Sequence, residues 1–400
     1  MKKRFFLLVL IMFGISIIQS LAQGIDDLKI THGPYLQNVT ETGATIIFTT
    51  NKLVAPGLMV NSGSGEFELI QNSHGGLIDV GDNIHKVRLE NLDPGQQYEY
   101  RLFACEIKNY RPYKCTFGDT LISQSYKFKT FDPGANHINF TVFCDVHDKA
   151  GKLSKYLDFN NVDKQDCYFL NGDILGHIEE EAQLYSSFLD VCVNRFATEK
   201  PFFYVRGNHE TRGKYARQLK NFLEFPNDSY YYSMTLGPVR FIILDGGEDK
   251  PDSSKEYSGL VDFDTYRLEE LAWLKNEVAS DEFIKAPFKI VVVHMPIMQN
   301  EKNWYGMAFL SEHFGPVLKN AGIDLMISGH THQNAWIESS KSGFDYPIMI
   351  SSNNNFIEVE VSKDKALIKL KDLNGKVENR YTVERKMNDS IYSNFLTKQI

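Results

Sequence analysis

The chain has 400 residues, of which 42% are hydrophobic and 24% charged, and it contains 28 glycines and 13 prolines. These values are ordinary for a soluble globular protein of two to three domains, and they exclude disordered, fibrous and disulfide-rich miniprotein classes. The formal net charge is −8 and the sequence has no basic stripe. We therefore expect no nucleic acid as a stable partner, because binding to phosphate backbones needs clustered cations.

The first residues have the pattern of an export signal. Three cations at positions 2–4 precede an apolar run at positions 5–18, and the small-residue pattern Ser20-Leu21-Ala22 follows. This pattern is typical of a secretory signal peptide, so we expect residues 1–22 to be cleaved. The apolar run is shorter than the roughly 20 residues that a membrane-spanning helix needs, and no later stretch reaches that length. We therefore expect a periplasmic or secreted protein with no membrane span after cleavage, and a charge of −11 once the three cations are lost.

Residues 25–131 are predicted to form strands only. Segments rich in β-branched and aromatic residues alternate with clusters of Gly, Asn, Asp and Pro, which is typical of a β-sandwich. The expected strands are 44–49, 57–60, 85–89, 98–102 and 125–130. Within them, Leu92-Asp93-Pro94-Gly95 followed by Tyr98 has the layout of a tyrosine corner, in which the phenol bonds back to the chain across a turn. This segment resembles a fibronectin type III domain, and residues 132–134 are the expected linker.

The five cysteines fall into two groups. Cys105 and Cys115 flank a stretch rich in turn formers, and an oxidising compartment would permit a disulfide between them, but connectivity needs geometry, so free thiols remain the alternative. Cys144, Cys167 and Cys192 lie in apolar runs or on a helical face, so we interpret them as small core residues.

Residues 137–385 are predicted to alternate strands and helices, which is typical of an α/β domain. The expected strands are 138–144, 168–170, 202–205, 241–244, 289–293 and 325–327, followed by 346–351, 356–361, 366–370 and 377–383. The clearest helix is 265–280, where Leu268, Leu271, Leu274 and Val278 recur at three- and four-residue steps and predict one apolar stripe. Residues 386–400 are expected to be a C-terminal tail.

Polar residues follow five of these strands at the point where each strand ends. Five of the chain's 11 histidines lie there, with two aspartates and one asparagine, and the carboxyl edge of an open sheet is where α/β folds place their sites. Any one of these fragments is weak, but together imidazole and carboxylate groups suit first-row metals such as Fe, Zn or Mn. The blocks are Asp145-Val146-His147, Gly172-Asp173, Gly207-Asn208-His209-Glu210, His294 and Gly329-His330-Thr331-His332.

The ordered set of these blocks resembles that of the calcineurin-like metallophosphoesterases, over about residues 138–385. The segment Gly33-Pro34-Tyr35-Leu36-Gln37, entering a fibronectin-like sandwich, is similar to the front half of purple acid phosphatases. The resemblance implies an α/β (α+β) metallophosphoesterase sandwich, with two β-sheets flanked by helices, preceded by an all-β fibronectin III-like sandwich.

The resemblance also implies two metal ions per chain, Fe, Zn or Mn, held by seven residues. One ion would be bound by Asp145, His147 and His332, the other by Asn208, His294 and His330, and Asp173 would bridge them.

Two positions depart from the purple acid phosphatase pattern. That family has a metal-binding Tyr three residues after the bridging Asp and lacks a His in the first block, whereas this chain has Gly176 and His147. We therefore expect a first site richer in nitrogen, without a phenolate, and a colourless enzyme.

The chemistry expected is hydrolysis of phosphomonoesters by attack of a hydroxide held between the two metals. His209 is the candidate general acid that protonates the leaving alkoxide, and its alternative role is to support Asn208. Arg206, Arg212 and His177 are candidate contacts for the substrate phosphate, although Arg206 could instead close an ion pair at the base of its loop. Tyr305 could stack on a leaving group or simply pack.

Three alternatives stay open or are disfavoured. A phosphodiesterase or nucleotide hydrolase could use the same metal centre, because the loops decide the leaving group. A non-catalytic binding protein is disfavoured, because every expected ligand and His209 are present. A metallo-β-lactamase type is disfavoured, because its His-x-His-x-Asp-His signature is absent. The natural substrate, the native metal pair and the oligomeric state are not determined by the sequence.

Overall fold

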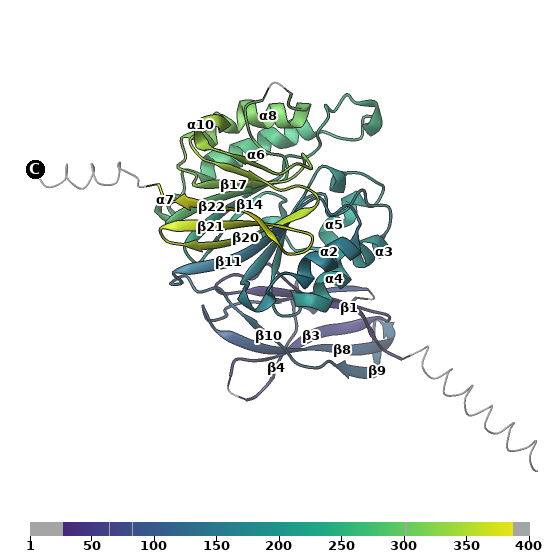
Figure 1. The fold of residues 1–400 in the computed structure, drawn as a ribbon. Helices are drawn as coiled ribbons and strands as arrows, with labels where there is room; N and C mark the ends of the chain where they lie inside the picture. Colours follow the sequence, from purple (N-terminus) through teal and green to yellow (C-terminus); the bar gives the residue numbers. More distant parts are fainter. Residues whose placement is uncertain (1–26, 64, 82, 301, 387–400) are drawn as a thin grey trace, which may run out of the picture.

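The computed structural model describes residues 27–386 except 64, 82 and 301. The expected signal peptide and nearly all of the expected tail lie outside these residues. The described chain forms an N-terminal β region and a larger region in which helices surround two sheets (Figure 1). In the described part of the chain, no helix is long and apolar enough to cross a bilayer.

The N-terminal β region contains two antiparallel sheets that enclose a small apolar core. One sheet has the order β1 (Ile30–Gln37), β2 (Ala44–Thr50) and β7 (Ile84–Leu89). The other has the order β10 (Tyr126–Lys129), β8 (Gln97–Arg111), β3 (Val54–Asn61) and β4 (Glu68–Ile70), and β9 (Lys114–Ile122) also pairs with β8. A small hairpin joins β5 (Ser73–His74) and β6 (Leu77–Ile78).

Alternation places one face of each strand in the core of this region, where Leu36, Phe48, Leu58 and Tyr100 are buried. The expected turn contact is confirmed, since the backbone N–H of Asp93 donates to the Tyr98 hydroxyl at 2.8 Å.

Cys105 and Cys115 are too far apart to form a disulfide. Cys105 lies opposite Thr120 in the β8–β9 pair, whereas Cys115 lies opposite Tyr110. Five residues along a strand span about 17 Å, and bridged Cα atoms lie within about 7 Å. Both thiols are free, and the other three cysteines are buried as expected.

The α/β region contains two six-stranded sheets. The first has the order β13 (Phe202–Val205), β12 (Cys167–Asn171), β11 (His137–Phe143), β20 (Asn355–Ser362), β21 (Lys365–Asp372) and β22 (Val377–Glu384). The second has the order β14 (Tyr232–Leu236), β15 (Val239–Leu244), β16 (Phe288–Val293), β17 (Leu325–Ser328), β19 (Ile348–Ile350) and β18 (Ala335–Ile337). Strands β11 to β13 run parallel, and so do β15, β16, β17 and β19.

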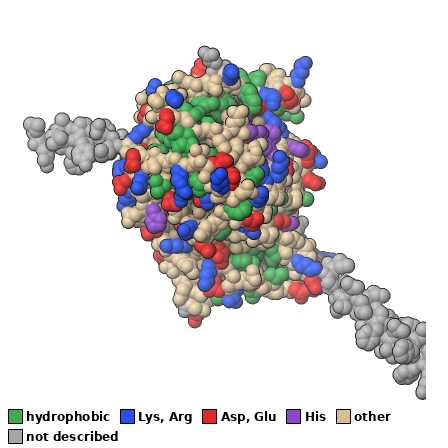
Figure 2. Space-filling model, in the orientation of Figure 1, with side chains coloured by type: hydrophobic (Ala, Val, Ile, Leu, Met, Phe, Trp, Pro, Cys, Tyr) green, Lys and Arg blue, Asp and Glu red, His purple; other side chains and the backbone are tan. Residues whose placement is uncertain are grey.

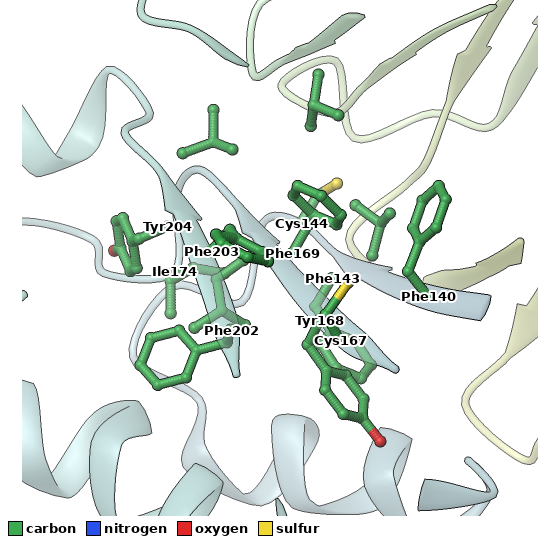
Figure 3. Packing of buried hydrophobic residues seen from close by; sticks show 14 of the residues in the cluster. Phe140, Phe143, Cys144, Cys167, Tyr168, Phe169, Ile174, Phe202, Phe203 and Tyr204 are labelled. Atoms are coloured by element: carbon green, nitrogen blue, oxygen red, sulfur yellow. The ribbon is translucent and has the colours of Figure 1, made fainter. Parts of the chain in front are cut away.

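The two sheets pack face to face through aromatic side chains. Phe140 of β11 makes edge contacts with Phe169 of β12 and Phe241 of β15, at ring-centroid distances of 5.3 and 5.2 Å. Phe169 in turn lies 5.0 Å from Phe241, so the core is continuous between the sheets. Figure 3 shows Phe140 and Phe169 projecting from adjacent strands of the first sheet into this layer.

Helices cover both outer faces, as the predicted fold class requires. The first sheet is flanked by α2 (Ala150–Asp158), α3 (Glu181–Leu184), α4 (Asp190–Cys192) and α5 (Leu219–Phe222), and the second by α6 (Phe263–Glu277) and α8 (Tyr305–His313) (Figure 1). The other α-helices of the described residues are α7 (Asp281–Lys285), α9 (Gly315–Lys319) and α10 (Ser339–Ser342). Single π-helical turns occupy Tyr185–Leu189 and Val193–Ala197, and 3-10 turns occupy Val162–Lys164, His209–Thr211, Ala216–Gln218, Pro226–Asp228 and Lys255–Tyr257.

The buried face of helix α6 differs from the apolar stripe that the sequence predicts. Leu271 and Leu274 are buried, but Leu268 is 52% exposed, and Arg267 and Glu270 are fully buried in its place. Arg267 Nε donates to the Gly246 carbonyl at 2.9 Å, and Glu270 Oε1 accepts the Asp245 N–H at 2.7 Å. The prediction for Leu268 was wrong because the loop after β15 brings buried backbone groups that need polar partners.

The N-terminal β region is joined to the α/β region through β1. The Tyr35 hydroxyl donates to the Phe222 carbonyl at 2.7 Å, and Gln37 Nε2 donates to the Phe202 carbonyl at 2.9 Å. His32 stacks on Tyr185 with ring centroids 3.7 Å apart. These contacts explain in physical terms why a Tyr and a Gln stand in the segment that resembles the purple acid phosphatases.

Candidate metal centre

The five polar blocks converge where both sheets end. Asp145 and His147 follow β11, Asp173 follows β12, Asn208 follows β13, His294 follows β16, and His330 and His332 follow β17. Because parallel strands end at a common edge, residues far apart in the sequence meet there. Histidine side chains also gather at the surface on the upper right of the space-filling view (Figure 2).

The backbone of these loops is unusual. Asp145, His147, Asp173, His330 and His332 have φ between 51° and 70°. Non-glycine residues rarely adopt this left-handed conformation, and such residues cluster at sites where function requires a fixed side-chain direction. The conformation turns each side chain back toward the shared edge of the sheets.

Asp145, His147 and His332 form the first ligand group. The two imidazoles face each other with Nε2 atoms 3.0 Å apart, and the Nε2 of His332 lies 3.3 Å from Oδ1 of Asp145. Two nitrogens bound at right angles to one ion, each about 2.1 Å from it, would be about 3.0 Å apart. The group therefore has the spacing of ligands to a single ion.

Asp173, His294 and His330 form a second, fully buried group, and Asn208 completes it. Asp173 Oδ2 lies 3.1 Å from His294 Nε2, and Asn208 Oδ1 lies 3.0 Å from His330 Nδ1. The other ring nitrogen of His294 contacts the Asn171 carbonyl at 2.9 Å, which orients the imidazole.

Asp173 also belongs to a third group with His147 and His209. Because His147 is a member of the first group, the Asp173 carboxylate lies between the first group and the second. Burial opposes ionisation of Asp173, but the adjacent His294 holds its pKa well below the usual range. The Asp173 carboxylate is thus ionised and lies close to histidines of both groups.

Unsatisfied polar atoms indicate that these residues fit metal ions. Asp145 Oδ1 and His294 Nε2 are buried without a hydrogen bond of good geometry in the described structure. Burial lowers the pKa of His147 to about 4, which keeps that imidazole neutral, as a ligand must be. Although burial lowers the pKa of His294, the carboxylates of Asp173 and Asp145 raise it to about 10, so this pocket attracts positive charge.

Two glycines allow the loops to approach one another. A Cβ on Gly172, which has φ +76°, would lie 2.4 Å from the His294 ring. A Cβ on Gly207 would lie 2.3 Å from Asp173 Oδ1. Any side chain at either position would displace a proposed ligand.

Glu210 is a functional residue for which the sequence assigned no role. Its carboxylate is fully buried and accepts the backbone N–H groups of Asp173, Gly207 and Leu175 at 2.9, 2.8 and 2.9 Å, and the Tyr204 hydroxyl at 2.9 Å. It therefore fixes two ligand loops to each other. The sequence feature that could have identified Glu210 is its position in the third block, one residue after His209.

His209 lies beside Asp173 and His147, and both of its ring nitrogens have polar contacts. Nδ1 contacts the Gly176 carbonyl at 2.7 Å, and Nε2 lies 3.1 Å from Arg212 Nη1. The Gly176 N–H donates to Asp148 Oδ2 at 2.7 Å. Gly176 thus orients His209 through its backbone.

Arg212 is fixed by an acidic pair that the sequence did not single out. Its Nε and Nη2 donate to the two carboxylate oxygens of Glu248, at 2.6 and 3.1 Å, and Nη2 also donates to Asp249 at 3.3 Å. This bidentate contact leaves Nη1 facing His209. Because Glu248 and Asp249 follow β15, the strand-end rule that found the ligands could have found them too.

The other candidate substrate contacts, Arg206, His177 and Tyr305, have different surroundings from Arg212. Arg206 pairs with the buried Asp245 at 2.5 Å and lies over the Tyr230 ring at 3.9 Å, which is the ion-pair alternative considered from the sequence. His177 is exposed. Tyr305 donates its hydroxyl to Asp264 at 2.7 Å.

Comparisons with known proteins identify the kind of domain that carries this site. Residues 138–334 match the family model for calcineurin-like phosphoesterases. The chain is 24% identical over 262 residues to purple acid phosphatase 21 of Arabidopsis thaliana, which is 62% of this chain and 52% of that protein. The matched part thus spans about half the length of that relative.

Two solved structures share the fold over 90% of this chain. Purple acid phosphatase PPD1 from seeds of yellow lupin (Lupinus luteus) has a TM-score of 0.67 at 15% identity, with 75% of that chain covered. A structure of PhoD has a TM-score of 0.61 at 12% identity, with 92% of that chain covered. All seven candidate ligands lie inside the matched segment, so residues 138–334 contain a calcineurin-like phosphoesterase domain.

Proposed function

We propose that this protein is a metal-dependent phosphomonoesterase that holds two ions. The observation that carries the proposal is the convergence of seven side chains into two ligand groups that share Asp173, with His209 beside them. Asp145, His147 and His332 would hold one ion, Asn208, His294 and His330 the other, and Asp173 both. Bound ions would supply Lewis acidity, which lowers the pKa of water and stabilises charge on phosphoryl oxygens.

The chain's own residues supply orientation and a proton. In its doubly protonated form, His209 would donate a proton from Nε2 to the leaving oxygen and become neutral, while Nδ1–H keeps its bond to the Gly176 carbonyl. Arg212 presents Nη1 next to Nε2, where a guanidinium N–H can bind a phosphoryl oxygen. Glu248 and Asp249 keep the guanidinium in this orientation before the substrate arrives.

Metal analysis followed by a substrate panel tests this function. Purified protein reconstituted with Mn, Zn or Fe is expected to hold close to two ions per chain, and Asp173→Ala should lose both. Phosphomonoesters should be hydrolysed faster than phosphodiesters and nucleotides. One ion or none in the wild type would refute the two-metal centre, and a preference for diesters would refute the substrate class while leaving the metal centre intact.

We also propose that the protein is exported. The support is the pattern of cations, apolar residues and small residues at positions 2–22. Fractionation of cells expressing the full chain, with N-terminal sequencing of the product, tests it. A mature N-terminus at Gln23 in an exported fraction is expected, and an uncleaved cytoplasmic product would refute export.

A further inference from the structure

A two-stranded ribbon projects from the N-terminal β region. Strand β8 pairs with β3 only through Glu99–Glu106, although β8 itself runs to Arg111. Beyond Glu106 its strand partner is β9, which continues the pairing to the turn. Residues 107–117, here called the ribbon, thus lie outside the four-strand part of the sheet. Figure 1 shows β9 at the end of the molecule opposite α8.

The ribbon exposes three aromatic side chains. Tyr110, Tyr113 and Phe117 are 67%, 102% and 61% exposed, and within the described structure none contacts another ring. Large apolar groups exposed together usually mark an interaction surface. Because Tyr113 stands at the turn and is wholly exposed, the surface is convex and is suited to enter a partner rather than to receive one.

The ribbon is also locally basic on an acidic protein. Residues 107–117 include Lys108, Arg111 and Lys114 and contain no Asp or Glu, whereas the chain carries a net charge of −8. All three cations are exposed, and none forms a salt bridge with a described residue. The nearest buried acid, Glu106, is already paired with Lys52 at 3.0 Å.

The length of the ribbon separates Arg111 and Lys114, next to the turn, from the acidic body. Five residues from Ile107 to the turn span about 17 Å, which is about twice the Debye length of about 8 Å at physiological ionic strength. The negative charge of the body is therefore largely screened at the turn. A negatively charged surface near the turn would be attracted to the cations there.

We propose that the ribbon docks the protein onto a lipid bilayer with anionic headgroups. Tyr and Phe side chains partition into the headgroup region, and Lys and Arg are attracted to anionic lipids. Two ribbons facing each other would bring together six cations and no acid, which disfavours a second copy as the partner. The enzyme then acts at a membrane surface without spanning it.

Vesicle sedimentation tests the proposal on the mature chain. The probe is a vesicle of phosphatidylcholine with about one third phosphatidylglycerol, compared with phosphatidylcholine alone. The protein is expected to sediment with the anionic vesicles at low salt and to be released at about 0.5 M salt. Each cation contributes about a five-fold factor, so K108S/R111S/K114S should bind about 100-fold more weakly.

A matched control removes three exposed lysines elsewhere. K363S/K365S/K376S makes the same change in net charge outside the ribbon and should bind the vesicles as the wild type does. Y113S/F117S should weaken binding without changing its salt dependence. Hydrolysis of a soluble phosphomonoester should be the same in all ribbon variants.

The exposed thiol of Cys115 provides a direct readout within the ribbon. An environment-sensitive fluorophore on Cys115 should shift its emission to shorter wavelength when anionic vesicles are added. Absence of sedimentation with anionic vesicles at low salt, or equal binding by K108S/R111S/K114S and the wild type, would overturn the proposal. A dimer in solution that Y113S/F117S abolishes, with no vesicle binding, would overturn it in favour of self-association.

Discussion

Replacing Glu210 with Gln is expected to weaken both folding and metal binding, although Glu210 is not a proposed ligand. The carboxylate accepts two N–H groups at Oε2, from Asp173 and Gly207, and one N–H and one hydroxyl at Oε1, from Leu175 and Tyr204. A Gln side chain turns one of these oxygens into an NH2 group, which can only donate. In either orientation of the amide, its NH2 group therefore faces groups that themselves donate hydrogen bonds.

The magnitude follows from the less costly orientation. With its NH2 toward Leu175 and Tyr204, the amide can still donate to the Tyr204 hydroxyl, which can turn and accept, so only the Leu175 N–H loses its acceptor. One unsatisfied buried donor costs about 1–3 kcal/mol, and a loss of that size is expected in the free energy of unfolding. The opposite orientation strands two N–H groups and costs about 2–6 kcal/mol. Because the loops of Asp173 and Asn208 lose a shared support, metal affinity should fall about 10- to 100-fold.

Denaturant unfolding of metal-free protein, at a pH above about 7 where Glu210 is ionised, and competition with a chelator measure the two effects. Glu269→Gln, on the exposed face of α6, is the matched control and should change the free energy of unfolding by less than about 0.5 kcal/mol. A Glu210→Gln protein with the stability and metal affinity of the wild type would show that this carboxylate does not hold the ligand loops together.

Three further outcomes are expected. His209→Ala should keep both metals but lose about 10²- to 10⁴-fold in turnover on poor leaving groups and much less on an activated aryl phosphate, and equal loss on both would favour an orienting role instead. Protein loaded with ferric iron should show no tyrosinate charge-transfer band in its visible spectrum, because the loop after Asp173 carries Gly176; a purple band would mean that another Tyr reaches the metal. Burial raises the pKa of Glu210 to about 7 from its ordinary 4.5, so the folded metal-free chain keeps a proton that the unfolded chain releases. Glu210 therefore contributes stability that falls as the pH rises through that range, and unfolding curves at several pH values should show a more negative slope of the free energy of unfolding against pH in the wild type than in Glu210→Gln.

The sequence by itself determined many of the strands and the position of the candidate metal centre. Short apolar runs bounded by turn residues are local signals, so β2, β11, β12, β16 and β20 lie within a residue or two of their predicted bounds. The blocks around Asp145, Asp173, Asn208, His294 and His330 could be assigned to one site because each follows a strand, and neighbouring parallel strands end at a common edge.

Only the tertiary structure decided which side chains pair with the arginines near the site. Arg206 pairs with Asp245 and Arg212 with Glu248, contacts made across 39 and 36 residues of chain that no local pattern encodes. Helix α6 buries Arg267 rather than Leu268 for the same reason, because the polar demand comes from the distant loop after β15. Periodicity in the sequence indicates which face of a helix or strand is apolar on average. The hydrogen-bond partners that buried backbone groups require depend on which distant segments the fold packs against that face.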